Sequence, residues 1–142
     1  MDAEFVATLY RVLRLDGFFP EFTSELAAKV FPRSGLYAYP RDVHVLDQGE
    51  EGRDLYIVRG GAISITQTLG SAGAELAVLR AGEVFGEIGL IKDGVRRATA
   101  VAKEDSAVYR LAYADVQYLL KNNPALGAHL QALAAVRLDG KE

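Results

Sequence analysis

The chain of 142 residues contains no cysteine, no tryptophan, one methionine and two histidines. The missing cysteines exclude disulfide frameworks, zinc ribbons, iron–sulfur centres and cysteine nucleophiles. His44 and His129 are too few for a histidine-rich metal site, so we expect structural or surface roles for both and no metal or cofactor. Neither a nucleophile elbow nor a serine–histidine–aspartate order is visible. The sequence therefore predicts a protein that is not an enzyme.

The chain also lacks any excess of positive charge. Sixteen Lys and Arg stand against nineteen Asp and Glu, for a formal net charge of -3, which is the wrong balance for a protein that coats nucleic acid. The acidic start, with Asp2 and Glu4, does not resemble a secretory signal, and no apolar run reaches the length of a membrane span. We expect a cytoplasmic protein that makes no contact with a membrane.

The first 33 residues have helical spacing. Apolar residues recur every three or four positions from Phe5 to Leu13, which predicts an amphipathic helix. A second, short helix is expected over residues 24–30, because Thr23 can cap its start and Pro32 follows its end.

From residue 36 to residue 111 the period changes to two, which is typical of strands. Short runs of β-branched and aromatic residues alternate with glycine-rich or aspartate-rich turns, one of them at residues 70–73. The predicted strands are 36–39, 43–46, 55–58, 62–66, 75–80, 98–102 and 107–111. Seven or eight short strands with this spacing indicate a barrel or a jelly roll.

Helical spacing returns after Ala112. Val116, Leu119 and Leu120 predict one helix, and Leu126, Leu130 and Leu133 predict another beyond the break at residues 122–124. We expect the second stripe to pack on the barrel, with a homodimer through this helix as the alternative.

The expected fold is α+β and mainly β. It is an eight-stranded antiparallel β-roll or jelly roll over residues 34–112, with N-terminal helices over residues 1–33 and a C-terminal helix pair over residues 113–142. No linker or repeat divides the chain, so residues 1–142 are expected to form a single domain.

Residues 82–100 interrupt the strands and are too many for a hairpin loop. Gly86 and Gly89 let backbone amides approach a ligand, and a short helix starting near Glu87 would direct N–H groups at an anion. Arg96 adds a guanidinium that can bind phosphate bidentately. Glu87 fits beside a phosphate if it accepts a hydrogen bond from a neutral hydroxyl such as a ribose 2′-OH. Phosphate and sugar together indicate a nucleotide.

These residues resemble the family of cyclic-nucleotide-binding domains found in catabolite activator proteins and in regulatory subunits of cyclic-AMP-dependent protein kinase. Residues 85–91 (Phe-Gly-Glu-Ile-Gly-Leu-Ile) and 96–99 (Arg-Arg-Ala-Thr) match the family's phosphate-binding cassette in composition and in the spacing from Glu to Arg. Residues 48–58 with Gly61, Phe18-Phe19 and Asn123-Pro124 also match.

The resemblance implies that Glu87 binds the ribose 2′-OH, that Arg96 binds the cyclic phosphate, and that amides around residues 86–89 and 97–98 complete the site. The expected ligand-binding residues are Phe85, Gly86, Glu87, Ile88, Gly89, Arg96, Arg97, Ala98 and Thr99. The base would lie on the apolar face of the barrel. Ile63 and Ile65, with Leu76 or its neighbours, are candidate walls in a register that the alternation leaves open.

Two positions depart from the family pattern. Val95 stands where the family usually has Pro, and Arg97 where it usually has a small residue. If both arginines lie in a strand they point to opposite faces, so only one can bind phosphate, and the spacing from Glu87 favours Arg96. Because a Thr or Ser at the position of Arg97 helps several relatives hold cyclic GMP, cyclic AMP is the favoured ligand, although Thr99 can still contribute.

The resemblance implies a sensor in which the bound cyclic nucleotide draws the cassette and the closing helix inward and so signals to an unidentified effector protein. No DNA contact is expected, since the helix-turn-helix that follows this domain in gene regulators is not part of the sequence. The alternative is a degenerate domain that binds no ligand and serves as a protein–protein docking module. Val95 and Arg97 favour that alternative, and the intact Glu87 and Arg96 oppose it.

Overall fold

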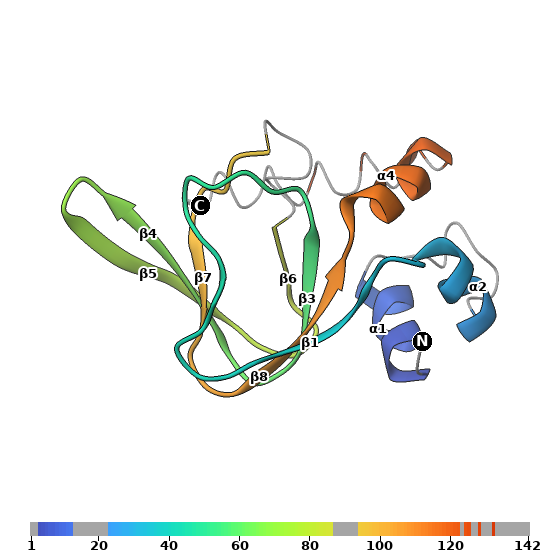
Figure 1. Ribbon diagram of the computed structural model, residues 1–142, viewed down its shortest axis with the longest axis horizontal. Coiled ribbons are helices and arrows are strands. Elements are labelled where there is room, and N and C mark those ends of the chain that lie inside the picture. Colours follow the sequence, from blue (N-terminus) through green and yellow to red (C-terminus); the bar gives the residue numbers. More distant parts are fainter. Residues whose placement is uncertain are drawn as a thin grey trace.

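The computed structural model describes residues 3–12, 23–86, 94–122, 124–125, 128 and 132. Its strands form two four-stranded sheets, and every strand pair is antiparallel. Helices lie beside one of the two sheets (Figure 1). The expectation of a mainly β fold with eight antiparallel strands and flanking helices is confirmed.

The two sheets take alternate parts of the chain. In spatial order, the first holds β1 (Gly35–Tyr39), β8 (Ser106–Leu111), β3 (Leu55–Gly60) and β6 (Val84–Phe85). The second holds β2 (His44–Leu46), β7 (Thr99–Ala102), β4 (Ile63–Leu69) and β5 (Ala72–Leu79). Because consecutive strands other than β4 and β5 lie in different sheets, segments far apart in sequence become neighbours.

Two expected boundaries are wrong. The short strand β6 occupies residues 84–85, where the sequence indicated no strand, and it pairs with β3. Strand β5 begins at Ala72, inside the expected turn at 70–73, and Ala72 pairs with Leu69 at the end of β4. The hairpin turn is therefore confined to Gly70 and Ser71. The small residues Ala72 and Gly73 are typical of a turn, but they pair with β4 because the hydrogen bonds between strands involve only the backbone.

The core lies between the two sheets, and both contribute to it. Its buried members are Leu46, Tyr56, Val58, Ile63, Ile65, Leu79, Phe85, Ala100, Ala102 and Val108. The rings of Tyr56 and Phe85 stack with centroids 5.0 Å apart. Residues 55–58 of β3 are all buried. Since successive side chains point to opposite faces, the sheet that contains β3 is covered on both sides.

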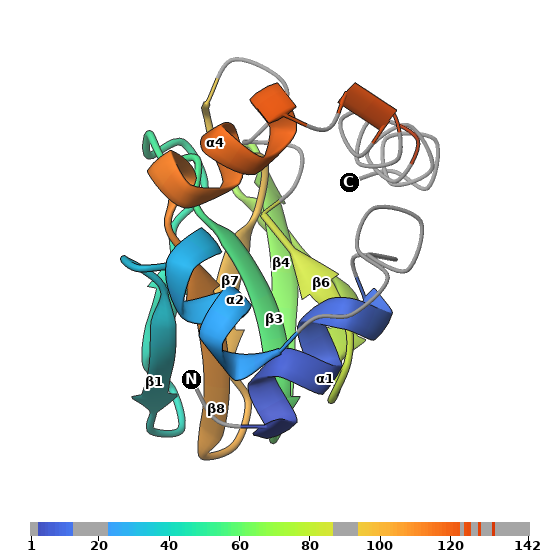
Figure 2. The same ribbon diagram turned by 90° about the vertical axis from the view of Figure 1, so that its right-hand side faces the viewer.

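The second cover of this sheet consists of helices. Figure 2 shows α1 (Ala3–Val12), α2 (Ser24–Val30) and α4 (Tyr113–Asn122) on the side of β3 that faces the viewer. The expected cap of α2 is present, because the Thr23 side chain accepts a hydrogen bond from the Leu26 N–H. Leu126, Leu130 and Leu133 of the expected second C-terminal helix lie outside the described residues.

Within the described part of the chain, no helix is both long enough and apolar enough to cross a membrane.

The buried carboxylate of Asp115 joins α4 to the segment that follows α2. It is 1% exposed and accepts hydrogen bonds from the Arg33 N–H (2.9 Å), the Ser34 hydroxyl (2.8 Å) and the Arg33 guanidinium (3.2 Å). Ser34 Oγ in turn accepts a bond from the Ala112 N–H at 3.0 Å. A network of this kind fixes the start of α4 against the segment between α2 and β1.

We expect Asp115→Ala to lower the free energy of unfolding by about 2–3 kcal/mol, because buried donors lose a charged acceptor. Chemical denaturation measures this change. The control is Asp105→Ala, which removes an exposed carboxylate that accepts one backbone N–H, from Arg41, and should cost about 1 kcal/mol. Equal losses in the two variants would show that burial adds nothing to the role of Asp115.

Candidate functional site

Two loop segments, residues 49–52 and 94–96, run side by side and hold Arg96 in place. Their backbone hydrogen bonds are Gly49 N–H to Arg96 O (2.8 Å), Arg96 N–H to Glu50 O (2.9 Å) and Gly52 N–H to Gly94 O (2.7 Å). Both polar groups of the Arg96 backbone are therefore satisfied by the first loop. This ladder fixes the direction in which the arginine side chain leaves the chain.

The guanidinium of Arg96 is buried among backbone carbonyls. Arg96 is 5% exposed, with Nη1 donating to Gly86 O at 3.1 Å and Nη2 donating to Asp54 O at 3.0 Å. Its Cζ lies 5.7 Å from the centre of the Tyr56 ring. Two of the five N–H groups of an arginine are used by these bonds. Among the described residues, Arg96 forms no ion pair with a carboxylate.

Within the described residues, this positive charge has no carboxylate in direct contact. Burial lowers the pKa of Arg96 from its ordinary value, while Tyr56, Asp54 and Glu50 act in the opposite direction. An arginine nevertheless stays protonated in a protein. Since a buried charge is costly unless it is paired, the geometry suits an anion that approaches the remaining N–H groups.

Two glycines make room for the guanidinium. A Cβ on Gly86, whose φ is +90°, would lie 2.8 Å from Asp54 O and 3.0 Å from Arg96 Nη1. A Cβ on Gly52 would lie 3.0 Å from both Nε and Nη2 of Arg96. The close backbone approach at Gly86 in this structure is therefore to Arg96 and to Asp54.

The expected ligand-binding residues divide into three groups. Phe85 and Gly86 lie beside Arg96, with Phe85 stacked on Tyr56, the ring that the guanidinium also faces. A second group, Glu87, Ile88 and Gly89, lies outside the described residues. The third group follows Arg96 along the chain toward β7.

In that third group each residue has a different environment. Arg97 is exposed, and its carbonyl accepts a hydrogen bond from the Gln67 amide at 3.2 Å. Ala98 packs partly buried against the core between the sheets. Thr99 Oγ1 accepts the Gln48 N–H at 2.9 Å. The two neighbouring arginines therefore differ in their environment. Arg96 is buried beside the carbonyls of Gly86 and Asp54, and Arg97 is exposed.

The candidate walls for a base lie on β4 and β5. Ile63 and Ile65 are buried in the core between the sheets, and they pair with Leu79 and Ala77. Directly paired residues share a face, so these two residues of β5 lie on the same face as the isoleucines. Leu76 does not pair across the ladder, because the register shifts between Ile65 and Thr66. Ala77, one of the neighbours that the sequence left as alternatives, lies on the face of the isoleucines instead.

Sequence reasoning assigned no role to Asp54 and Tyr56. Both lie in the segment 48–58, which resembles the family without indicating what either side chain does. Arg96 is 42 residues from Asp54, and no periodicity connects positions across that distance. The only available signal is local, an acidic residue directly before a strongly apolar strand.

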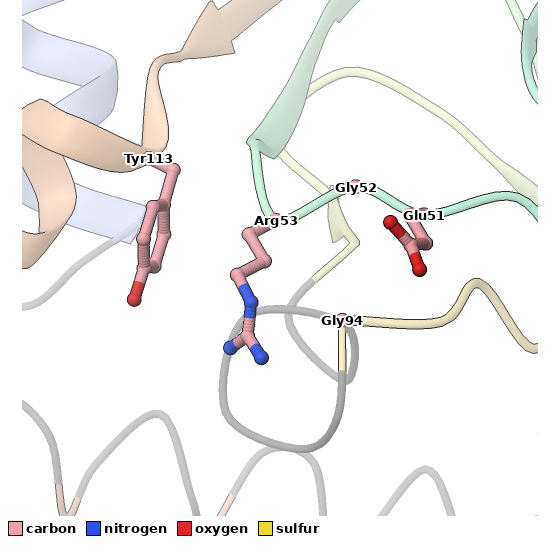
Figure 3. Close-up of a pocket in the computed structure, with 5 residues that line it drawn as sticks. All are labelled: Glu51, Gly52, Arg53, Gly94 and Tyr113. Atoms are coloured by element: carbon pink, nitrogen blue, oxygen red, sulfur yellow. The ribbon is translucent and has the colours of Figure 1, made fainter.

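A hollow of about 460 Å³ opens beside the same loops (Figure 3). Its lining residues are Glu51, Gly52, Arg53, Gly94 and Tyr113. Figure 3 shows the Arg53 side chain extending between Tyr113 and Gly94. Its Cζ lies 5.6 Å from the centre of the Tyr113 ring. Gly94 and Tyr113, the first residue of α4, thus lie on opposite sides of the Arg53 side chain.

Comparisons with known proteins agree with this geometry. Residues 37–123 match the family described as the cyclic nucleotide-binding domain. The cyclic AMP receptor protein of Thermus thermophilus is 37% identical over 115 residues, which are 80% of this chain and 52% of that protein. The chain spans about half the length of the curated relatives it matches.

Solved structures show the same likeness. The catabolite activator protein of Thermus thermophilus has a TM-score of 0.72 and 32% identity, covering 90% of this chain and 58% of that one. A cyclic nucleotide-binding domain from Methylobacillus flagellatus has a TM-score of 0.74 and 24% identity, covering 96% of this chain and 80% of that one.

We expect Gly86→Ala to lower the free energy of unfolding by about 2–5 kcal/mol. A left-handed backbone costs an L-residue about 1–2 kcal/mol, and overpacking adds about 1–3 kcal/mol. Gly49→Ala is the matched control, because Gly49 has φ +88° and nothing within 4 Å of its added Cβ, and it should cost only the backbone part. Chemical denaturation of both variants decides, and equal losses would contradict the crowding described at Gly86.

Proposed function

The chain belongs to the cyclic nucleotide-binding domain family, and we propose that it binds cyclic AMP through Arg96 and acts as a non-catalytic sensor. In this proposal residues 1–142 form one cytoplasmic domain. The nucleotide phosphate takes the remaining N–H groups of Arg96, and the base lies against the apolar face that carries Ile63 and Ile65.

One observation carries this proposal, the burial of Arg96 with no carboxylate partner among the described residues. Two carbonyls orient the guanidinium without neutralising it. An oriented, desolvated guanidinium is well suited to phosphate oxygens, because charge-assisted hydrogen bonds to it are short and strong.

The charge of the site favours a cyclic phosphate over an open one. A cyclic phosphodiester carries a single negative charge, which one guanidinium balances. A phosphate monoester carries about -1.5 to -2 at pH 7, and Arg97, the adjacent cation, is exposed. We therefore propose that AMP binds much more weakly than the cyclic nucleotide.

Cyclic AMP is proposed over cyclic GMP on two grounds. Arg97 stands at the position where a Thr or Ser helps several relatives hold cyclic GMP, so the hydroxyl that would favour guanine is not present there. The relative that is 37% identical is named as a cyclic AMP receptor. The role of Glu87 at the ribose remains a prediction, since that residue lies outside the described part of the chain.

The outputs of the sensor are also proposals. A protein effector, or another part of a longer protein, would receive the signal through the helices beside β3. The expectation of no DNA contact stays a prediction, because the chain spans about half the length of relatives named as transcriptional regulators.

Thermal unfolding with cyclic AMP, cyclic GMP and AMP tests the ligand. A ligand that binds only the folded state at a hundredfold excess over Kd adds about 2.7 kcal/mol of stability, which corresponds to a rise of several degrees in Tm. We expect the largest rise with cyclic AMP and none with AMP. No rise with any of the three would favour the docking module, in which the fold is kept and the ligand is lost.

The assignment of Arg96 has its own test. Loss of a charged hydrogen-bond partner costs about 1.5–3 kcal/mol, so Arg96→Ala should bind cyclic AMP about 10–100-fold more weakly by calorimetry. Arg96→Lys keeps the charge and loses the paired donors of the guanidinium, so its affinity for cyclic AMP should fall about tenfold. This second variant keeps the test informative if Arg96→Ala does not fold. Arg97→Ala is the control and should bind within about threefold of the native chain. The reverse pattern would show that the other arginine binds phosphate.

A further inference from the structure

Asp54 touches three parts of the molecule at once. Its backbone carbonyl accepts the bond from Arg96 Nη2 at 3.0 Å. Its carboxylate accepts the N–H of Tyr113, the first residue of α4, at 2.8 Å, and pairs with Arg110 Nε of β8 at 2.6 Å. A single residue therefore carries contacts to the phosphate-binding arginine and to the start of a helix.

The Asp54 carboxylate takes the place of a cap for the first N–H of α4, because the side chain of the residue before the helix cannot provide one. Ala112 accepts the first backbone bonds of the helix, from Asp115 and Val116, but its methyl group has no acceptor for the N–H groups of the first turn. The N–H of Tyr113 therefore needs an acceptor from elsewhere, and the positive end of the helix dipole favours a negative one. Asp54 supplies it from a distant part of the sequence.

Arg53 makes a second connection between the same two parts. Its guanidinium lies over the Tyr113 ring. Its Nε lies 2.8 Å from the position that a Cβ on Gly94 would occupy, so the Arg53 side chain packs against the backbone at Gly94. Figure 3 shows this placement.

We infer that Asp54 is a positioning residue that couples ligand binding at Arg96 to the start of α4. The inference rests on the proposed function. An anion on the remaining N–H groups shifts the guanidinium relative to the Asp54 carbonyl. Leu55 is fully buried, so β3 does not follow, and the change is taken up at residue 54. The cap on Tyr113 then changes with it.

The test compares the native chain with Asp54→Ala. This variant removes the carboxylate and keeps the carbonyl that orients Arg96, so the affinity for cyclic AMP should stay within about tenfold. The readout is the hydrogen exchange of the amides of residues 114–118. We expect saturating cyclic AMP to change these exchange rates about tenfold in the native chain and less than twofold in Asp54→Ala.

A second variant breaks the same contact from the helix side. Tyr113→Pro removes the N–H that Asp54 accepts, and proline is favoured at the first position of a helix, so it should fold even if Asp54→Ala does not. It should likewise bind cyclic AMP and lose the exchange response. Asp54→Asn keeps an acceptor for the Tyr113 N–H and should restore at least half of the response.

The control is Glu51→Ala, which removes a carboxylate from the same loop. No hydrogen bond of the Glu51 side chain to α4 is present among the described residues, so binding and response should both be native. Native-like responses in Asp54→Ala or Tyr113→Pro would overturn the inference, as would an Asp54→Asn that behaves like Asp54→Ala. A native chain that binds none of the nucleotides would instead overturn the proposed function, and the two failures are therefore distinguishable.

Discussion

The burial of one positive charge is the constraint on which the rest of the site depends. Keeping the Arg96 guanidinium 5% exposed requires acceptors, and within the described part of the chain these are the backbone carbonyls of Gly86 and Asp54. Glycine at positions 52 and 86 follows from that choice, because a side chain at either would collide with the guanidinium. Among the described residues the result is a cation that is oriented but not paired with a carboxylate, which is the preorganisation that an anion site needs.

The sheets supply the rigidity that this arrangement requires. Tyr56 belongs to the core between the sheets, and its ring is stacked by Phe85 on one side of the site and faced by Arg96. Close-packed protein interiors have low compressibility, so the core around Tyr56 resists small displacements. A shift at Arg96 is therefore more easily taken up at residues 53–54, before β3 begins, than within the roll. That boundary between loop and strand is where the site meets α4.

The sequence predicted the architecture because each signal was local. Alternation of apolar residues located most strands, and Thr23 located the start of α2. Alternation did not indicate β6, which has only two residues. It also placed the β4–β5 turn too widely, because the small residues at the start of β5 pair with β4 through their backbone. At the site, glycines and an arginine identified the cassette. The partners Asp54 and Tyr56 could not be found, because strand crossing between the sheets, rather than spacing, brings them to Arg96.

The start of α4 is held from two directions of unequal strength. Asp115 is fully buried and joins the helix to Arg33 and Ser34 through several hydrogen bonds, whereas Asp54 holds it through one carboxylate contact beside an exposed ion pair. The buried contacts are the more costly to break. A displacement of α4 that originates at Asp54 would therefore leave the Asp115 contacts intact and carry the end of α2 with it, so that the two helices respond as one unit on the outer face of the sheet.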